Sequence, residues 1–343
     1  MSSKNYMREG FSLGIESTAD DFGVGIVSFD GEVLANVNDV YIPDKGGIHP
    51  REASRHHVIV AGRVIAEALR RAGIKPKEID VIAFSQGPGL GPCLRVGATV
   101  ARALASYLGK PLVGVNHCLA HIEMGRMVNR VKDPVTLYVS GGNTIVSAFE
   151  AGRYRIFGET LDIAVGNCLD VFAREAGLRP EPGKPLGAAL EELASRGRRL
   201  IQLPYTVKGM DMSFSGLLTA AVNLLRGGKY PLEDLCFSLQ EIAFSMLTEV
   251  TERALAHTEK VEVLLTGGVA ANKRLQSMLR AMAEEHGAHF SVVSKEYATD
   301  NGAMIAWTGV LCYKYGLTIP IEKSFVRMKW RLDDVDVPWF GAH

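Results

Sequence analysis

The sequence predicts an α/β protein in which one supersecondary unit is used twice. Each copy opens with three short apolar runs joined by tight polar turns, at residues 13–16, 23–27 and 32–35 and again at 137–140, 144–147 and 154–157. Each triplet is followed by a helical segment and then by a buried-type strand, at 81–85 and 263–266, that ends in a glycine loop. Strands that alternate with helices in this way are typical of layered α/β folds. We therefore expect two similar lobes, each with a five-stranded mixed sheet.

The later elements of the first copy follow from their own patterns. Residues 57–72 carry apolar side chains at helical spacing, which predicts an amphipathic helix. The next strand ends in the glycine loop 87–91, which is expected to open another helix. A last strand at 111–115 ends at Asn116, a favoured N-cap residue, so a helix is predicted from His117.

The second copy repeats this plan with longer insertions. Residues 239–255 have the apolar spacing of a packed helix, and the following strand ends at Gly267 and Gly268. The segment 177–187 is rich in proline and glycine and is predicted to be a loop. Residues 209–216 are predicted to form another loop, with a helix beginning near Ser215.

Length and composition agree with two lobes. The chain has 343 residues, of which 47% are hydrophobic, enough for two substantial cores. We expect the first lobe to comprise residues 1–130 with 310–343, and the second to comprise 131–309. The N-terminal stretch has no apolar h-region, and no apolar run approaches the roughly 20 residues that span a bilayer, so neither a signal peptide nor a membrane helix is expected.

Cysteine usage indicates a reducing compartment. The five cysteines are odd in number, scattered and never spaced C-x-x-C. This pattern argues against a disulfide framework or a thiolate zinc site, and it favours a cytoplasmic protein.

The glycine loops favour a nucleotide ligand. Glycine lets backbone N–H groups approach a phosphate closely, and the N-terminus of the helix that follows favours negative charge. Because both lobes carry such loops, a nucleotide bound by the duplicated fold is the first functional hypothesis.

A histidine pair is the sharpest chemical signal. The spacing of His117 and His121 places both imidazoles on one helix face, where they can share a metal ion. A pair of ordinary helix histidines is the alternative, but Asp300 offers a carboxylate at the equivalent junction of the second copy. A metalloprotease is disfavoured, because its H-E-x-x-H motif needs glutamate where Cys118 stands. Two imidazoles with an oxygen ligand suit iron, zinc or manganese.

At the level of longer motifs, the chain resembles a known family. The motifs lie at residues 46–52, 85–92, 115–121, 138–144, 158–162, 209–216, 267–272 and 300–304. Across about residues 13–331 the chain is similar to the archaeal and eukaryotic KEOPS-complex tRNA N6-adenosine threonylcarbamoyltransferases, within the universal TsaD family. That resemblance implies the actin-like ATPase (ASKHA) fold, with two duplicated RNase H-like lobes around a nucleotide cleft.

The resemblance also implies a reaction and a set of site residues. In the family, threonylcarbamoyl-adenylate donates its threonylcarbamoyl group to N6 of adenosine 37 in tRNAs that read codons beginning with adenine, and AMP is released. The metal ligands fall on His117, His121, Tyr138 and Asp300, with iron(II) the preferred ion and zinc the alternative. The contacts with ATP or the adenylate fall on Tyr138, Val139, Ser140, Gly141, Gly142, Asp170, Gly183, Glu191 and Asn272. From the residues alone, Tyr138 would be a core aromatic and Asp170 a carboxylate near a helix N-terminus.

Two places depart from the family pattern. The stretch that contacts the ribose carries about three extra residues here, so Gly183 and Glu191 are the expected equivalents across an insertion. The first lobe's turn after Glu16 varies, and no catalytic base is assigned from it. Glu16 itself either orients a metal or water or is a buried structural carboxylate.

Partners are expected from both charge and resemblance. The formal net charge is zero, and the basic clusters at 126–132, 196–199 and 323–331 are each typical of a solvated surface. Binding of tRNA is therefore expected to need the KEOPS subunits that the family resemblance implies: an atypical small protein kinase, a dimerising small subunit and an accessory subunit.

Two other function classes remain open from the sequence. A sugar or acid kinase of the same superfamily would share the duplicated fold and the glycine loops, but it would not explain two histidines and an aspartate. A scaffold protein could retain the nucleotide site without turnover.

Overall fold

The computed structural model describes residues 10–43, 47–180 and 186–340. The chain divides into two compact units, Met1–Met127 with Asp300–His343 and Val128–Thr299. The expected division, 1–130 with 310–343 and 131–309, stays a prediction about domains. In the structure, helix α10 (Gly302–Lys314) packs on the sheet of the first unit, so the chain rejoins that unit at Asp300.

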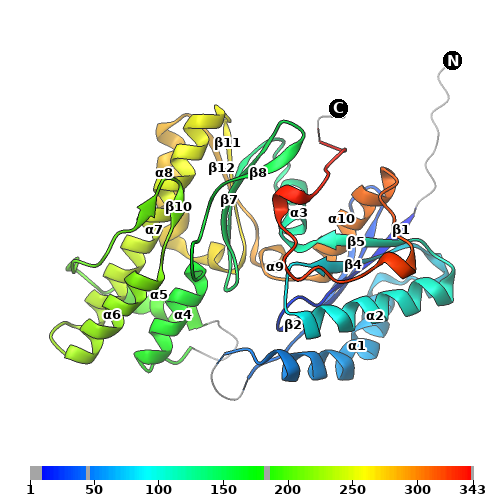
Figure 1. Cartoon of the computed structure of the whole chain (residues 1–343), viewed down its shortest axis with the longest axis horizontal. Helices are drawn as coiled ribbons and strands as arrows, with labels where there is room; N and C mark the ends of the chain where they lie inside the picture. The colour runs from blue at the N-terminus through cyan, green and yellow to red at the C-terminus, as the bar shows by residue number, and fades with distance from the viewer. Residues whose placement is uncertain (1–9, 44–46, 181–185, 341–343) are drawn as a thin grey trace. The chain divides into compact units, whose positions relative to one another are not determined.

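The first unit contains a five-stranded mixed sheet in the order β3-β2-β1-β4-β5. Its strands are β1 (Phe11–Glu16), β2 (Asp21–Ser28), β3 (Val33–Val40), β4 (Ile79–Gly87) and β5 (Leu112–Asn116). The first three strands pair antiparallel, whereas β4 and β5 join parallel to β1. Helices α1 (Pro50–Ala72) and α2 (Gly91–Leu108) run along one face of this sheet (Figure 1).

The second unit repeats this topology. Its sheet has the order β12-β11-β6-β7-β8, which matches the first sheet read from its other edge. The strands are β6 (Val135–Val139), β7 (Thr144–Glu150), β8 (Arg153–Glu159), β11 (Glu262–Thr266) and β12 (His289–Val292). Here too the first three strands are antiparallel and the last two parallel, so the prediction of a duplicated α/β unit is confirmed.

Helices of the second unit gather around one long central helix. That helix is α7 (Leu232–Thr258), and α4 (Val165–Glu175), α5 (Leu186–Ala194) and α6 (Ser215–Gly227) pack against it or one another. Helix α8 (Lys273–Glu285) lies on α7 and the β11–β12 edge. Smaller elements are the hairpin β9 (Val207–Lys208) with β10 (Asp211–Met212), the 3₁₀ turn η2 (Gly268–Ala271) and the short helix α9 (Lys295–Ala298).

The start of helix α1 was predicted too late along the chain. Helix α1 begins at Pro50, seven residues before the predicted start, with proline in the first turn where its missing N–H costs nothing. Polar residues fill that first stretch, so apolar periodicity alone did not include it.

No helix in the described ranges combines the length and the apolar character needed to cross a membrane.

Glycines let α10 approach the first sheet closely. Alternate residues of β1 face opposite ways: Leu13 and Ile15 join the core beneath α1 and α2, whereas Gly14 faces α10. A Cβ on Gly14 would lie 2.1 Å from the backbone nitrogen of Ala306, and one on Gly25 would lie 2.2 Å from that of Ala303. Any larger residue would push the helix off the strands.

We predict that Gly25→Ala destabilises the protein, because the added methyl group meets helix backbone that cannot move aside. Overpacking of this kind costs about 1–3 kcal/mol of unfolding free energy. The control is Gly62→Ala on the exposed side of α1, where nothing lies within 4 Å and helix propensity should add up to about 1 kcal/mol. Denaturant midpoints measure both, and a Gly25→Ala midpoint equal to that of the parent would contradict the packing argument.

Candidate metal centre and nucleotide loops

The histidine pair is set by the end of a buried strand. Strand β5 ends at Asn116, whose side-chain oxygen accepts the Leu119 N–H at 3.1 Å and so caps helix α3 (His117–Asn129). The predicted N-cap is therefore present. His117 and His121 follow in the first turns of α3, both buried, with ring centroids 4.7 Å apart and planes nearly perpendicular.

Asp300 completes a triad within the first unit. It precedes α10, whose N-cap Asn301 accepts the Met304 N–H at 3.0 Å. Its Oδ1 lies 3.0 Å from His121 Nε2 and 3.5 Å from His117 Nε2. One ligand atom from each residue of this triad lies within 4.8 Å of the others. Two imidazoles and one carboxylate around a common point are a set that a single metal ion can use.

Glu16 supports the triad from behind. Its carboxylate is fully buried, and Oε2 lies 3.1 Å from His117 Nδ1. The other oxygen accepts the N–H and the hydroxyl of Thr18. A carboxylate on Nδ1 favours the tautomer with its proton there, which leaves Nε2 as a lone pair directed to the triad. Both sequence alternatives for Glu16, an orienting role and a buried structural carboxylate, stay predictions, since its side chain is fully buried as well as in contact with His117.

Local electrostatics favour a cation at the triad. Burial lowers the pKa of His121, so its imidazole is a neutral donor, as metal ligation requires. Burial opposes ionisation of Asp300, but His117 and then His121 outweigh it and hold the pKa of that carboxyl far below its usual range. Nearby, burial and then the Asp300 charge raise the pKa of Asp20 to about 6, and the same causes raise the pKa of Asp21. Neighbouring carboxylates repel one another when they are ionised, and a bound cation would stabilise their charged forms.

Asp20 and Asp21 were not assigned from the sequence. Asp20 lies in the turn after β1 and Asp21 begins β2, and the signal available was a pair of adjacent acids beside an apolar strand. Their altered pKa values arise from burial and from Asp300, which is distant in sequence. The local sequence pattern therefore could not identify these two residues.

The predicted glycine loop of the second unit is open. It joins β6 to β7 and is held by its own hydrogen bonds: the Ser140 N–H reaches Asn143 O at 2.8 Å, and Ser140 Oγ accepts the Asn143 N–H at 3.0 Å. A Cβ on Gly141 or Gly142 would meet nothing within 4 Å, so space remains above the loop. A Cβ on Gly267, by contrast, would lie 2.1 Å from Val139 O, so the glycine loop after β11 sits directly against the end of β6.

The other predicted nucleotide residues gather near the start of α8. Asn272 caps this helix by accepting the N–H groups of Arg274 and Leu275, and its amide donates to Gln240 Oε1 at 2.9 Å. Glu191 accepts the Lys273 N–H at 2.7 Å, which brings α5 to the same helix end.

Asp170 stands on α4 close to the start of α5. A Cβ on Gly187 would lie 3.8 Å from its carboxylate, and burial raises the pKa of this group. Gly183 lies outside the described residues. Tyr138 belongs to β6 of the second unit, with its side chain buried and its hydroxyl 3.4 Å from Asn143 Nδ2. Its place in the ligand set stays a prediction.

Comparison with known proteins assigns the family. A family model described as TsaD, tRNA N6-adenosine threonylcarbamoyltransferase, matches residues 32–307. The chain belongs to this family. The resemblance inferred from the motifs is thereby confirmed, and so is the prediction of a transferase.

Relatives of this family are similar over nearly the whole chain. A tRNA N6-adenosine threonylcarbamoyltransferase of Thermofilum pendens is 57% identical over 327 residues, which cover 95% of this chain and 96% of that protein. A relative in Methanothermobacter thermautotrophicus, named "Probable bifunctional tRNA threonylcarbamoyladenosine biosynthesis protein", is 59% identical over 95% of this chain but only 60% of its own length.

A solved structure supports the fold class. HypF of T. kodakarensis aligns with a TM-score of 0.64 and 16% identity, covering 90% of this chain and 48% of that one. The predicted ASKHA-type α/β fold is confirmed, and at this identity the likeness concerns the fold alone.

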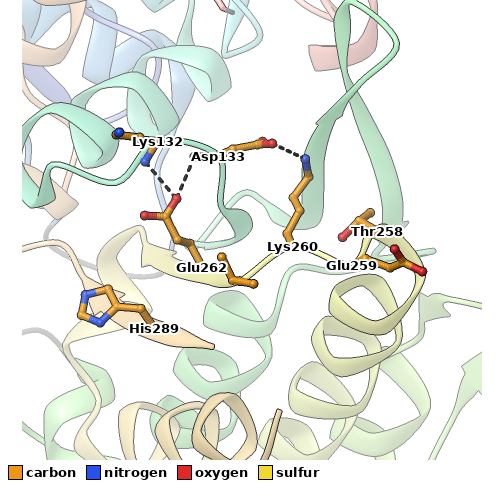
Figure 2. A pocket seen from close by; sticks show the side chains of 8 residues that line it. Lys132, Asp133, Thr258, Glu259, Lys260, Glu262 and His289 are labelled. Atoms are coloured by element: carbon orange, nitrogen blue, oxygen red, sulfur yellow. Dashed lines mark hydrogen bonds and ion pairs between the residues drawn. The ribbon is translucent and has the colours of Figure 1, made fainter. Parts of the chain in front are cut away.

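A pocket of about 590 Å³ on the second unit is separate from these residues (Figure 2). Glu262 accepts the N–H groups of Lys132 and Asp133 at 2.9 and 2.8 Å, and Lys260 pairs with the Asp133 carboxylate at 2.7 Å. These contacts fasten the segment before β6 to the start of β11. Its lining contains none of the predicted ligand or nucleotide residues, so we assign it a structural role.

We predict that His117→Ala or His121→Ala strips a bound metal, because either change removes one of two nitrogen donors. Metal-to-protein ratios of protein purified without chelator measure the loss. His289→Ala, at an exposed position on the second unit, is the matched control and should leave the ratio unchanged. Full metal occupancy in the double histidine variant would refute the triad.

We predict that Glu16→Gln weakens metal binding while the fold persists, since the side chain keeps its shape but loses the charge beside His117. Loss of such an outer partner typically reduces metal affinity about 10- to 100-fold. Competition with a chromophoric chelator measures the affinity, and thermal unfolding of the metal-free protein checks stability. An affinity equal to that of the parent would leave Glu16 with a structural role only.

Proposed function

We propose that the chain transfers the threonylcarbamoyl group of threonylcarbamoyl-adenylate to N6 of adenosine 37 in tRNAs that read codons beginning with adenine. The observation that carries the proposal is the triad of the buried His117 and His121 with the partly exposed Asp300 in a chain of this family. In the reaction the N6 nitrogen bonds to the carbamoyl carbon, the bond from that carbon to the phosphate oxygen breaks, and AMP leaves. The N6 proton passes to a base that we do not assign.

We propose one divalent metal, iron(II) with zinc as the alternative, held by the triad and by Tyr138 as a fourth ligand. Two imidazoles and a carboxylate are the donors of non-haem iron sites that keep open positions. When bound, the ion supplies a Lewis acid that neutralises charge on the donor's carboxylate or carbonyl. His117, fixed by Glu16, and the ionised Asp300 hold that position without rearrangement.

We propose that the second unit binds ATP or the adenylate. The predicted contacts are Tyr138, Val139, Ser140, Gly141, Gly142, Asp170, Gly183, Glu191 and Asn272. The unobstructed backbone at Gly141 and Gly142 supports this, because glycine lets a phosphate approach the main chain closely. Glu191 already accepts the first N–H of α8, so in binding the nucleotide it would also keep this structural hydrogen bond.

We propose tRNA and the KEOPS subunits as partners. The subunits are an atypical small protein kinase, a dimerising small subunit and an accessory subunit. Zero net charge supports a need for other basic surfaces, and the relative named bifunctional extends well beyond the length that this chain matches. A cytoplasmic location is supported by the five cysteines, all buried and free of disulfides.

We expect the reconstituted assembly, given threonine, bicarbonate, ATP, an adenylate synthase and tRNA, to form threonylcarbamoyladenosine. The isolated chain should be slow, and partner subunits should raise the rate in a salt-sensitive way. Asp300→Asn should lower the transfer rate by about 10²–10³-fold, the usual loss when one charge-stabilising group is removed. Asn272→Ala should instead weaken binding of the adenylate.

Nucleoside analysis of the tRNA measures the product. Wild-type assembly that leaves adenosine 37 unmodified while it phosphorylates a small alcohol or acid would favour the kinase alternative. Adenylate binding with no turnover on any acceptor would favour the scaffold alternative.

A further inference from the structure

A basic and aromatic segment near the C-terminus lies directly against the loops that lead to the triad. We define residues 321–331 as the C-terminal strap. It carries the cations Lys323, Arg327, Lys329 and Arg331 with a single acid, Glu322, in a chain whose overall charge is zero. The strap therefore has a local excess of positive charge, although the chain as a whole is neutral.

We propose that the C-terminal strap binds the substrate RNA, by ion pairs with its phosphates and by stacking one unpaired base on Phe325. The inference rests on the proposed function, to which it adds the surface that the single-stranded loop of the tRNA contacts. A duplex is a poorer fit, because its bases are already stacked and cannot cover an exposed aromatic ring.

The backbone of the strap is held firmly. Gln86, at the end of β4, donates its amide to Phe325 O at 2.7 Å, and its own carbonyl accepts the Arg327 N–H at 2.7 Å. The Gly89 N–H reaches Met328 O at 3.3 Å. Arg102 of α2 holds Ser324 through both its hydroxyl and its carbonyl. With its main chain tied to the first unit in this way, the strap has its longer side chains free to project outward.

Those side chains are exposed, and three of the cations have no ion-pair partner. Phe325 is 70% exposed and Met328 51%, so both apolar side chains are available to a ligand. Within the part of the chain that the structure describes, Lys323, Arg327 and Lys329 have no carboxylate within 4.0 Å, whereas Arg331 pairs with Asp333 at 3.0 Å. The Arg327 guanidinium lies 4.1 Å from the centre of the Trp330 ring, which keeps it extended and in place.

The strap also adjoins the triad through Asn116. The amide of Asn116 donates to Trp330 O at 3.2 Å, while its oxygen caps α3. The next residue along the chain is His117. An RNA loop held on the strap would therefore lie beside the residues proposed to hold the metal, as transfer to a base in that loop requires.

Unpaired cations around an exposed aromatic ring match a single-stranded polyanion better than they match a protein partner. A protein surface would have to supply several acids to the cations and also an apolar site for the ring. One nucleotide supplies both a phosphate and a base, and consecutive nucleotides repeat the pair.

Two strap variants test this. The first combines Lys323→Ala, Arg327→Ala and Lys329→Ala, and the second is Phe325→Ala. Each variant is assembled with the partner subunits, because tRNA binding is expected to need them, and binding of the assembly to fluorescently labelled substrate tRNA is measured by anisotropy across a range of salt concentrations. Loss of three phosphate contacts should reduce the slope of log K against log salt by about 2, because each contact to a single strand contributes about 0.7. Phe325→Ala should weaken binding roughly tenfold with the slope unchanged, as expected for loss of one stacked base.

Matched controls are available on the same unit. Lys75→Ala with Lys77→Ala removes exposed charge, and Tyr107→Ala removes an aromatic side chain that is 86% exposed; both should bind tRNA like the parent. Thermal unfolding checks that each variant is folded. A variant that combines Lys323→Arg, Arg327→Lys and Lys329→Arg keeps all three charges and should bind tRNA like the parent.

The outcomes separate this inference from the proposed function. If the wild-type assembly modifies tRNA and the strap variants bind and modify it equally well, the strap inference is wrong and the function stands. If the wild type binds tRNA through the strap but does not modify it, the inference stands and the function fails. Strap variants that keep tRNA binding but lose a protein subunit of the assembly would show a protein interface and overturn the inference.

Discussion

The close contact between α10 and the first sheet is the constraint on which the candidate site depends. Asp300 is 179 residues from His121 along the chain, yet their side chains lie 3.0 Å apart. The approach is possible because Gly14 and Gly25 present bare backbone to α10, and because Gly302 presents the same to β2. The helix enters through the Asn301 cap, so the residue just before that cap is delivered to the histidines. Packing that involves no reactive group thus sets the geometry of the triad.

Charge and burial act together at this place. Glu16 lies at Nδ1 of His117 and Asp300 at Nε2; the Glu16 side chain is fully buried, whereas that of Asp300 is 20% exposed. Largely buried carboxylates cost free energy unless their charge is compensated, and burial also lowers the pKa of the neighbouring His121, which disfavours its cationic form. A divalent cation would complete the compensation.

Much of the fold could be predicted because it depends on local patterns. Strand triplets, glycine loops and the Asn116 cap each have a signature within a few residues, and the repeated order of elements gave the same topology for both units. The start of α1 at Pro50 was missed, since its first turns are polar and pack little. The contacts of Glu16 and the altered pKa values of Asp20 and Asp21 depend on residues far along the chain. Sequence patterns record such distant contacts only through resemblance to a family.

The duplicated units have specialised in different ways at equivalent positions. After the fifth strand of the first unit, the chain enters α3 with two buried histidines. After the fifth strand of the second unit it passes through the short α9 and leaves for the first unit at Asp300. The second unit instead keeps an unobstructed glycine loop between β6 and β7, a feature suited to backbone contacts with phosphate. In the first unit the corresponding turn between β1 and β2 carries acids, which repel phosphate and attract cations. A single ancestral topology can therefore support a cation site in one copy and an anion site in the other, with the difference set by a few turn residues.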